Sequence, residues 1–187
     1  MGAESYITNF PDGLPCPPLL VKLTQFYERT GGYLPGELEL STDGRQQVTG
    51  WFAGNEVAAR PFVAFAIDNA DSFFSYWRYE DQPLDRAPLV YLHFEDGSLN
   101  TVLTNTLEEF LVLLALGNPA YTIDMVEGKD EPEIGDDVAS YRMWLHDEVG
   151  VETPTIGEAH AIMERARTAH PDLSTWVGRQ IEEMRNA

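Results

Sequence analysis

Basic residues are scarce in this chain: 12 Lys and Arg stand against 31 Asp and Glu among 187 residues, a formal net charge of -19 at pH 7. The phosphates of a nucleic acid would repel such a chain at close range, so we expect no nucleic-acid binding. The charge favours a basic protein partner, although a strongly charged surface also serves solubility alone. Hydrophobic content of 43% with 11% aromatics excludes a disordered chain, and the length suits one domain.

Cysteine and long apolar runs are also nearly absent. Cys16 is the only cysteine, so no internal disulfide forms and a reducing compartment is expected. Residues 1–18 show no basic segment followed by an apolar one, as a secretory signal would. The longest apolar run, "FLVLLALG" at 110–117, is too short to span a bilayer. The sequence therefore predicts a cytoplasmic protein without membrane association.

Motifs that carry known chemistries are missing as well. The four histidines are scattered, with no pair at metal-ligand spacing. There is no Walker loop, no GxGxxG after a strand and no GxSxG elbow. Cys16 has no basic neighbour in sequence that would lower its pKa. We therefore predict no catalytic residue, no metal site and no cofactor, and a protein that is not an enzyme.

Periodicity predicts one helix followed by a sheet. Pro17 and Pro18 suit the first turn of a helix whose apolar residues recur at helical spacing up to Thr30. Alternation or continuous apolarity then predicts strands, with turns at 41–44, 68–71 and 95–98 between or beside them. The expected strands are 36–41, 61–67, 72–79, 88–94 and 100–104. The unbroken apolarity of "PLVYLHF" indicates a central strand covered on both faces.

Helical patterns dominate the rest of the chain. Thr106 to Glu109 matches a capping box that opens an apolar helix closed by Gly117. Residues 124–137 hold seven acids and one lysine and are interpreted as an exposed acidic linker. Three amphipathic helices follow within 138–187, the second opened by a capping box at Thr155 to Glu158 and the third by Asp172. The prediction is an α+β fold, a mostly antiparallel sheet backed by helices with a C-terminal helical segment, in one domain over 1–187 whose core spans about 15–120.

The Glu95-Asp96-Gly97 corner poses the main functional question. Paired carboxylates serve as general acids only when one is desolvated, and an adjacent pair at a polar turn stays solvated. We therefore interpret the corner as a turn whose charges are free for intermolecular contacts. His93, inside an apolar stretch, is expected to be a core histidine with its ring nitrogens satisfied. Trp51, flanked by glycines in "TGWFAGNE", is the best candidate for a surface anchor.

Two stretches carry a resemblance to a known family. "FVAFAIDNADSFFSYWRYED" and "APLVYLHFEDGSLNTVLTNTLEEFLVLLALG", between Phe62 and Gly117, resemble the SUKH superfamily, which joins fungal cell-wall synthesis regulators to bacterial toxin-immunity proteins. The matching positions are Asp68, Trp77, Glu95, Gly97, Glu109, Phe110, Leu111, Leu114, Ala115 and Gly117. The resemblance implies an antiparallel sheet backed by helices and a non-enzymatic binding role, which in bacterial members is commonly the neutralisation of a cognate toxin, often a nuclease.

The leading hypothesis is an intracellular immunity protein that binds a basic toxin domain through an acidic face. The expected partner-binding residues are Asp68, Asp71, Glu80, Asp81, Glu95, Asp96 and Trp51, the acids because they fall in turns at sheet edges. A regulatory or scaffolding protein of the same fold, binding another partner, is one alternative. A hydrolase using the carboxylates near Glu95 is the other, and it predicts a concave pocket holding a His or an acid of raised pKa.

Overall fold

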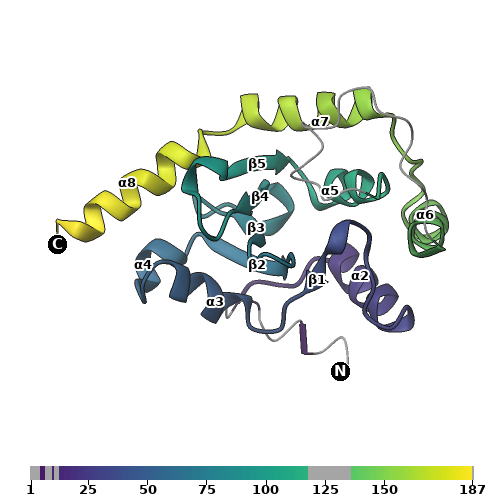
Figure 1. Cartoon of the computed structure of the whole chain (residues 1–187), viewed down its shortest axis with the longest axis horizontal. Coiled ribbons are helices and arrows are strands. Elements are labelled where there is room, and N and C mark those ends of the chain that lie inside the picture. The colour runs from purple at the N-terminus through teal and green to yellow at the C-terminus, as the bar shows by residue number, and fades with distance from the viewer. Residues whose placement is uncertain (1–4, 7–9, 11–12, 118–135, 187) are drawn as a thin grey trace.

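The structure is a computed structural model that describes residues 5–6, 10, 13–117 and 136–186. Its centre is a five-stranded sheet in the order β1-β2-β3-β4-β5, in which every neighbouring pair is antiparallel (Figure 1). The strands are β1 (Glu39–Leu40), β2 (Phe62–Ile67), β3 (Phe73–Trp77), β4 (Leu89–Leu92) and β5 (Thr101–Thr104). The strand order follows the chain, so each strand pairs with the next one in sequence.

Helices cover both faces of this sheet (Figure 1). On one face lie α2 (Pro18–Arg29), α5 (Leu107–Leu114) and α6 (Asp136–Val149). On the other lie α3 (Gly44–Trp51), α4 (Glu56–Ala59) and α8 (Leu173–Arg185). α7 (Ile156–Ala169) contributes to both clusters and lies along β5. The α+β prediction, with an antiparallel sheet and C-terminal helices, is confirmed.

Strand alternation explains why the strands are so apolar. Successive side chains point to opposite faces, and here both faces are buried. In β3, Phe74 and Tyr76 join the cluster under α2 and α5, whereas Phe73 and Trp77 join the cluster under α3 and α8. All four residues of β4 are buried, as the continuous "PLVYLHF" run predicted. Each fully buried Leu or Phe of this kind contributes about 1.5–3 kcal/mol to folding.

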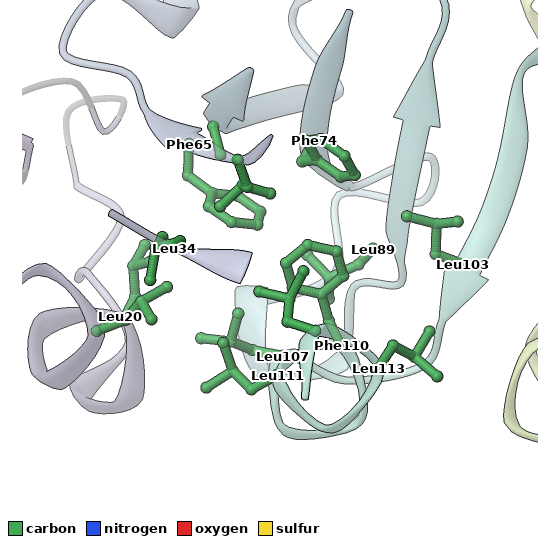
Figure 2. Close-up of a cluster of buried hydrophobic side chains, with 14 of the residues drawn as sticks. Leu20, Leu34, Phe65, Phe74, Leu89, Leu103, Leu107, Phe110, Leu111 and Leu113 are labelled. Atoms are coloured by element: carbon green, nitrogen blue, oxygen red, sulfur yellow. The ribbon is translucent and has the colours of Figure 1, made fainter. Parts of the chain in front are cut away.

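The larger cluster forms where α5 packs against the sheet (Figure 2). Phe110 lies at its centre, with its ring centroid 5.8 Å from Phe65 of β2 and 5.5 Å from Phe74 of β3. Leu20 of α2 and Leu111 of α5 lie nearby in the same cluster (Figure 2). The nearly uniform apolarity of α5 follows from this position, because sheet and helices surround it.

α7 covers the β5 edge of the sheet. β5 is an edge strand, and an exposed edge would offer unpaired amides and carbonyls to other chains. α7 packs along β5, and the Arg167 Nε donates to Thr101 Oγ1 at 3.2 Å. The other edge strand, β1, has only two residues, which also limits edge-to-edge pairing.

Most element predictions are confirmed, including the helix after Pro17, the 68–71 hairpin turn and the three C-terminal helices. The Thr155 capping box is present in both directions. The predicted box at Thr106 is only half formed, because the Glu109 carboxylate accepts from the amide of Asn105 instead of Thr106. α3 was not predicted at all.

The predicted acidic linker, 124–137, lies outside the described residues except for 136–137. The prediction is wrong for these two residues, because they begin α6.

α6 is fixed to the end of α5 by two hydrogen bonds. Tyr141 Oη donates to Leu111 O at 2.9 Å, and Arg142 Nε donates to Ala115 O at 2.7 Å. A guanidinium at the carbonyl end of a helix also interacts favourably with the helix dipole. Among the helices of the described residues, none combines the length and apolarity needed to cross a membrane.

Candidate partner-binding surface

The acidic corner is a structured loop of eight residues, 93–100, between β4 and β5. The Nδ1 atom of His93 accepts from the backbone amides of Glu95 at 3.2 Å and Asp96 at 2.9 Å. Both bonds run from loop amides to this one ring nitrogen, so His93 holds the two acidic residues in place. His93 was predicted to be a core residue, but it is only half-buried and lies just past the end of β4. Its Nδ1 atom is hydrogen-bonded, as expected, to two backbone amides of the loop.

Both carboxylates of the corner face solvent, because Glu95 and Asp96 are exposed. Asp96 Oδ1 accepts from the Ser98 hydroxyl at 2.6 Å and from the Ser98 amide at 2.9 Å. These hydrogen bonds lower the pKa of the Asp96 carboxyl below its ordinary value. A general acid needs a raised pKa, so this shift runs opposite to what acid catalysis requires.

Hydrogen bonds within the loop and from two other segments fix the corner to the fold. The His93 amide donates to Asn100 Oδ1 at 2.9 Å, and the Phe94 amide donates to Ser72 Oγ at 3.1 Å. The hydroxyl of Ser174, at the start of α8, lies 3.0 Å from Gly97 O and 2.9 Å from the carbonyl of Asn100. The loop is thus held before any partner arrives, which lowers the entropy cost of binding.

An aromatic pocket lies beside the corner. Trp51, the last residue of α3, donates its indole Nε1 proton to Phe94 O at 3.3 Å, which joins α3 to the loop. The Phe94 side chain is 52% exposed, unusual for a phenylalanine. A pocket of about 310 Å³ is lined by Gln47, Gly50, Trp51, Ile67, Asp71, Phe73 and Phe94. Trp51, predicted as a surface anchor, is half-buried and forms one wall of this pocket.

The two aspartates of the β2–β3 turn differ in burial. Asp71 is exposed and lines the pocket, in a left-handed conformation with φ of 57°. Asp68 is only 3% exposed, so the prediction that it belongs to an exposed acidic face is wrong. Its carboxylate accepts from the amides of Ala70 and Ser72, both at 2.9 Å, and from Tyr91 Oη at 2.7 Å. Asp68 therefore stabilises the turn that exposes Asp71.

Glu80 and Asp81 are exposed, but they lie at the opposite end of β3 from the 68–71 turn. Asp81 there lies 3.9 Å from the Arg60 guanidinium, and its carbonyl accepts from Arg78 at 3.0 Å. The register explains the separation: Phe73, at the start of β3, pairs with Leu92, so β4 ends beside the 68–71 turn. The predicted site residues thus divide into two groups, one at each end of the sheet.

We define the corner surface as Trp51, Asp71, Glu95 and Asp96 from the first group, together with Phe94. Sequence reasoning missed Phe94 because it continues the apolar "PLVYLHF" run and looked like a strand residue. The strand ends at Leu92, so the phenylalanine faces outward. Its position next to an acidic turn was the only available signal.

Two further titratable groups, Cys16 and His170, lie away from the corner surface. Burial raises the pKa of the Cys16 thiol to about 11, which makes it a poor nucleophile. His170 bridges Tyr79 Oη and Asn105 Oδ1, each at 3.0 Å, as a structural link between loops. Over residues 5–6, 10, 13–117 and 136–186, no group of three His, Cys, Asp or Glu side chains could hold a metal ion.

No family model, curated protein or solved structure matches this chain.

Proposed function

We propose that this chain is a non-enzymatic binding protein that holds a basic protein partner on the corner surface. The observation that carries the proposal is the pairing of exposed carboxylates with an exposed aromatic pocket on a loop fixed by hydrogen bonds. Asp71, Glu95 and Asp96 supply the charge, and Trp51 and Phe94 supply the apolar contact.

This arrangement has the two parts of an efficient protein interface. Exposed charges of one sign steer an oppositely charged partner and raise its association rate, especially at low salt. Aromatic side chains in a pocket near the centre of an interface contribute most of its binding free energy. The net charge of -19 extends the attractive field well beyond the corner itself.

The resemblance to the SUKH superfamily supports a narrower form of the proposal. In that form the partner is a cognate toxin domain, often a nuclease, and the chain is an immunity protein of the cytoplasm. Nuclease active sites are basic because they hold phosphate, and an acidic surface complements them. A regulatory or scaffolding role differs only in the identity of the basic partner, and the same surface serves it.

The hydrolase alternative receives less support from the geometry. Glu95 is exposed and does not line the neighbouring pocket. The pKa of Asp96 is lowered, and the nearest imidazole, His93, uses Nδ1 to accept two amides of the loop. An exposed Glu95, an Asp96 of lowered pKa and a His93 already bonded to the loop suit recognition better than proton transfer.

Two matched variants test the proposal. The first neutralises the corner surface with Asp71→Asn, Glu95→Gln and Asp96→Asn. The second removes the same charge from the other end of the sheet with Glu80→Gln, Asp81→Asn and Glu108→Gln. Glu108 lies in the first turn of α5, just after the end of β5. That end of β5 pairs with the start of β4, whereas the corner follows the end of β4. Each affinity is measured by calorimetry against the basic protein domain encoded next to this chain's gene, over a range of salt concentrations.

We expect the wild type to bind with an affinity that falls steeply with salt, and the corner variant to bind at least about tenfold more weakly. The opposite-end variant should lose much less, because screening limits charges more than about 10 Å away at 0.1 M salt. Equal losses in the two variants would move the binding surface away from the corner. If the neighbouring domain showed no salt-sensitive affinity for the wild type, the proposal itself would be lost.

A further inference from the structure

The pocket of the corner surface is small and mostly apolar. Its volume of about 310 Å³ is at the small end of the range for ligand sites, about 300–1,000 Å³. Its walls are mostly apolar and aromatic, from Trp51, Ile67, Phe73 and Phe94. A pocket of this kind has room for one or two protein side chains and little more.

One charged group interrupts those walls. Asp71 is the only ionisable residue among those that line the pocket. No hydrogen bond or ion pair engages its carboxylate within the described residues, where only its amide is bonded, to Asp68 O at 3.2 Å. Gln47, the other long polar side chain of the wall, is already bonded through Oε1 to Ser41 Oγ at 2.9 Å. The carboxylate of Asp71 is therefore the side-chain acceptor available to a cationic ligand.

We propose that this pocket receives the side chain of a Lys or Arg from the partner, an inference that rests on the proposed function. The aliphatic stem of such a side chain packs on Trp51 and Phe94, and its cationic head meets Asp71. Aromatic faces also attract cations, most strongly the face of Trp. Glu95 and Asp96, exposed beside Phe94, attract further basic residues that flank the anchor.

A neutral apolar side chain is the competing occupant. It would bury the same aromatic area, but it would leave the Asp71 carboxylate partly desolvated without a partner, which costs free energy. Charge complementarity therefore selects the cationic side chain over an apolar one of equal length. Citrulline and norleucine provide the comparison, because citrulline keeps the hydrogen-bond donors of arginine without its charge, and norleucine keeps the stem alone.

The test uses three capped tripeptides, acetyl-Gly-X-Gly-amide with X as arginine, citrulline or norleucine, titrated at low ionic strength into the full-length protein labelled with ¹⁵N. The Trp51 indole N–H resonance is followed and assigned with the Trp51→Phe variant. Because this N–H bonds to Phe94 O in the wall of the pocket, its shift reports occupancy directly. Trp144, buried in the other hydrophobic cluster under α2 and α5, is the internal reference.

We expect the arginine peptide to shift the Trp51 resonance in a saturable manner, and the other two peptides to bind at least about threefold more weakly. Asp71→Asn should raise the dissociation constant of the arginine peptide by about two- to fivefold, whereas Glu108→Gln should leave it unchanged. Asparagine tolerates the left-handed backbone of residue 71, so the variant keeps its fold. Norleucine binding as tightly as arginine, or no response at Trp51, would overturn the inference.

The outcomes for the inference and for the proposed function separate clearly. A partner domain whose salt-sensitive affinity depends on the corner surface but not on Asp71 alone would support the function and refute the cationic anchor. A saturable arginine response without any binding of the neighbouring basic domain would support the anchor pocket and refute the proposed function.

Discussion

Asp68→Ala gives the sharpest test of how the fold builds the corner surface. The carboxylate is 3% exposed and accepts three hydrogen bonds, from Tyr91 Oη and from the amides of Ala70 and Ser72. Ala70 is exposed, so water can replace its lost acceptor. Tyr91 and Ser72 are buried at 1% and 0% exposure, and in the variant both donors lose their acceptor.

Leaving a buried donor unsatisfied costs about 1–3 kcal/mol, so two such donors predict a loss of about 2–6 kcal/mol in the free energy of unfolding. That is a large share of the total stability of a domain, about 5–15 kcal/mol. The loss is measured by urea denaturation followed by tryptophan fluorescence. Thermal melting provides a second measurement, since each kcal/mol lowers the Tm of a domain of this size by about 2–4 °C.

Two further variants make the prediction specific. Asp71→Asn, three residues away and exposed, should change the free energy of unfolding by less than about 0.5 kcal/mol. In a Tyr91→Phe background the hydroxyl donor is gone, so Asp68→Ala should cost less than in the wild type by about 0.5–3 kcal/mol. The explanation by buried hydrogen bonds would be refuted if the free energy of unfolding of Asp68→Ala lay within about 1 kcal/mol of the wild-type value. It would also be refuted if the effects of Asp68→Ala and Tyr91→Phe were additive.

Three other substitutions test separate parts of the structure. Gly117→Ala should lower the free energy of unfolding, measured by urea denaturation, by about 1–2 kcal/mol. The backbone φ there is 81°, and a Cβ would lie 3.2 Å from Val138 Cγ2. An unchanged free energy of unfolding would contradict this close contact. Burial lowers the pKa of His170, so the unfolded chain binds protons more readily and stability should fall as the pH drops through the ordinary histidine range; His170→Gln should flatten that part of the pH profile. Ser174→Ala should accelerate hydrogen exchange at the Gly97 loop while costing only about 0.5–1.5 kcal/mol, and unaltered exchange would show that α8 does not hold the loop.

Local patterns in the sequence were sufficient for most of the fold. The spacing of apolar residues predicted α2, α5 and the C-terminal helices, and continuous apolarity identified β4 as a strand buried on both faces. These signals are local because helical periodicity and strand alternation depend on neighbours within a few residues. α3 escaped prediction because "GRQQVTGW" has two glycines and few apolar residues, so packing against β2 stabilises it more than its own propensity does.

The candidate site depended on tertiary structure to a greater extent. The sequence showed that Asp71, Glu95 and Trp51 were in turns or beside glycines, and all three do belong to one surface. It could not distinguish the buried Asp68 from the exposed Asp71, because burial of a carboxylate is decided by Tyr91, 23 residues later in the chain.

Composition and short-range periodicity encode the sign of the charge, the order of most elements and the faces that had to be buried. Which acids share a surface depends on long-range strand pairing. Antiparallel pairing of β3 with β4 brings the 68–71 turn beside the 93–100 loop and sends Glu80 and Asp81 to the far end of the sheet. That pairing joins residues 13 to 19 positions apart, a separation over which no local pattern carries information.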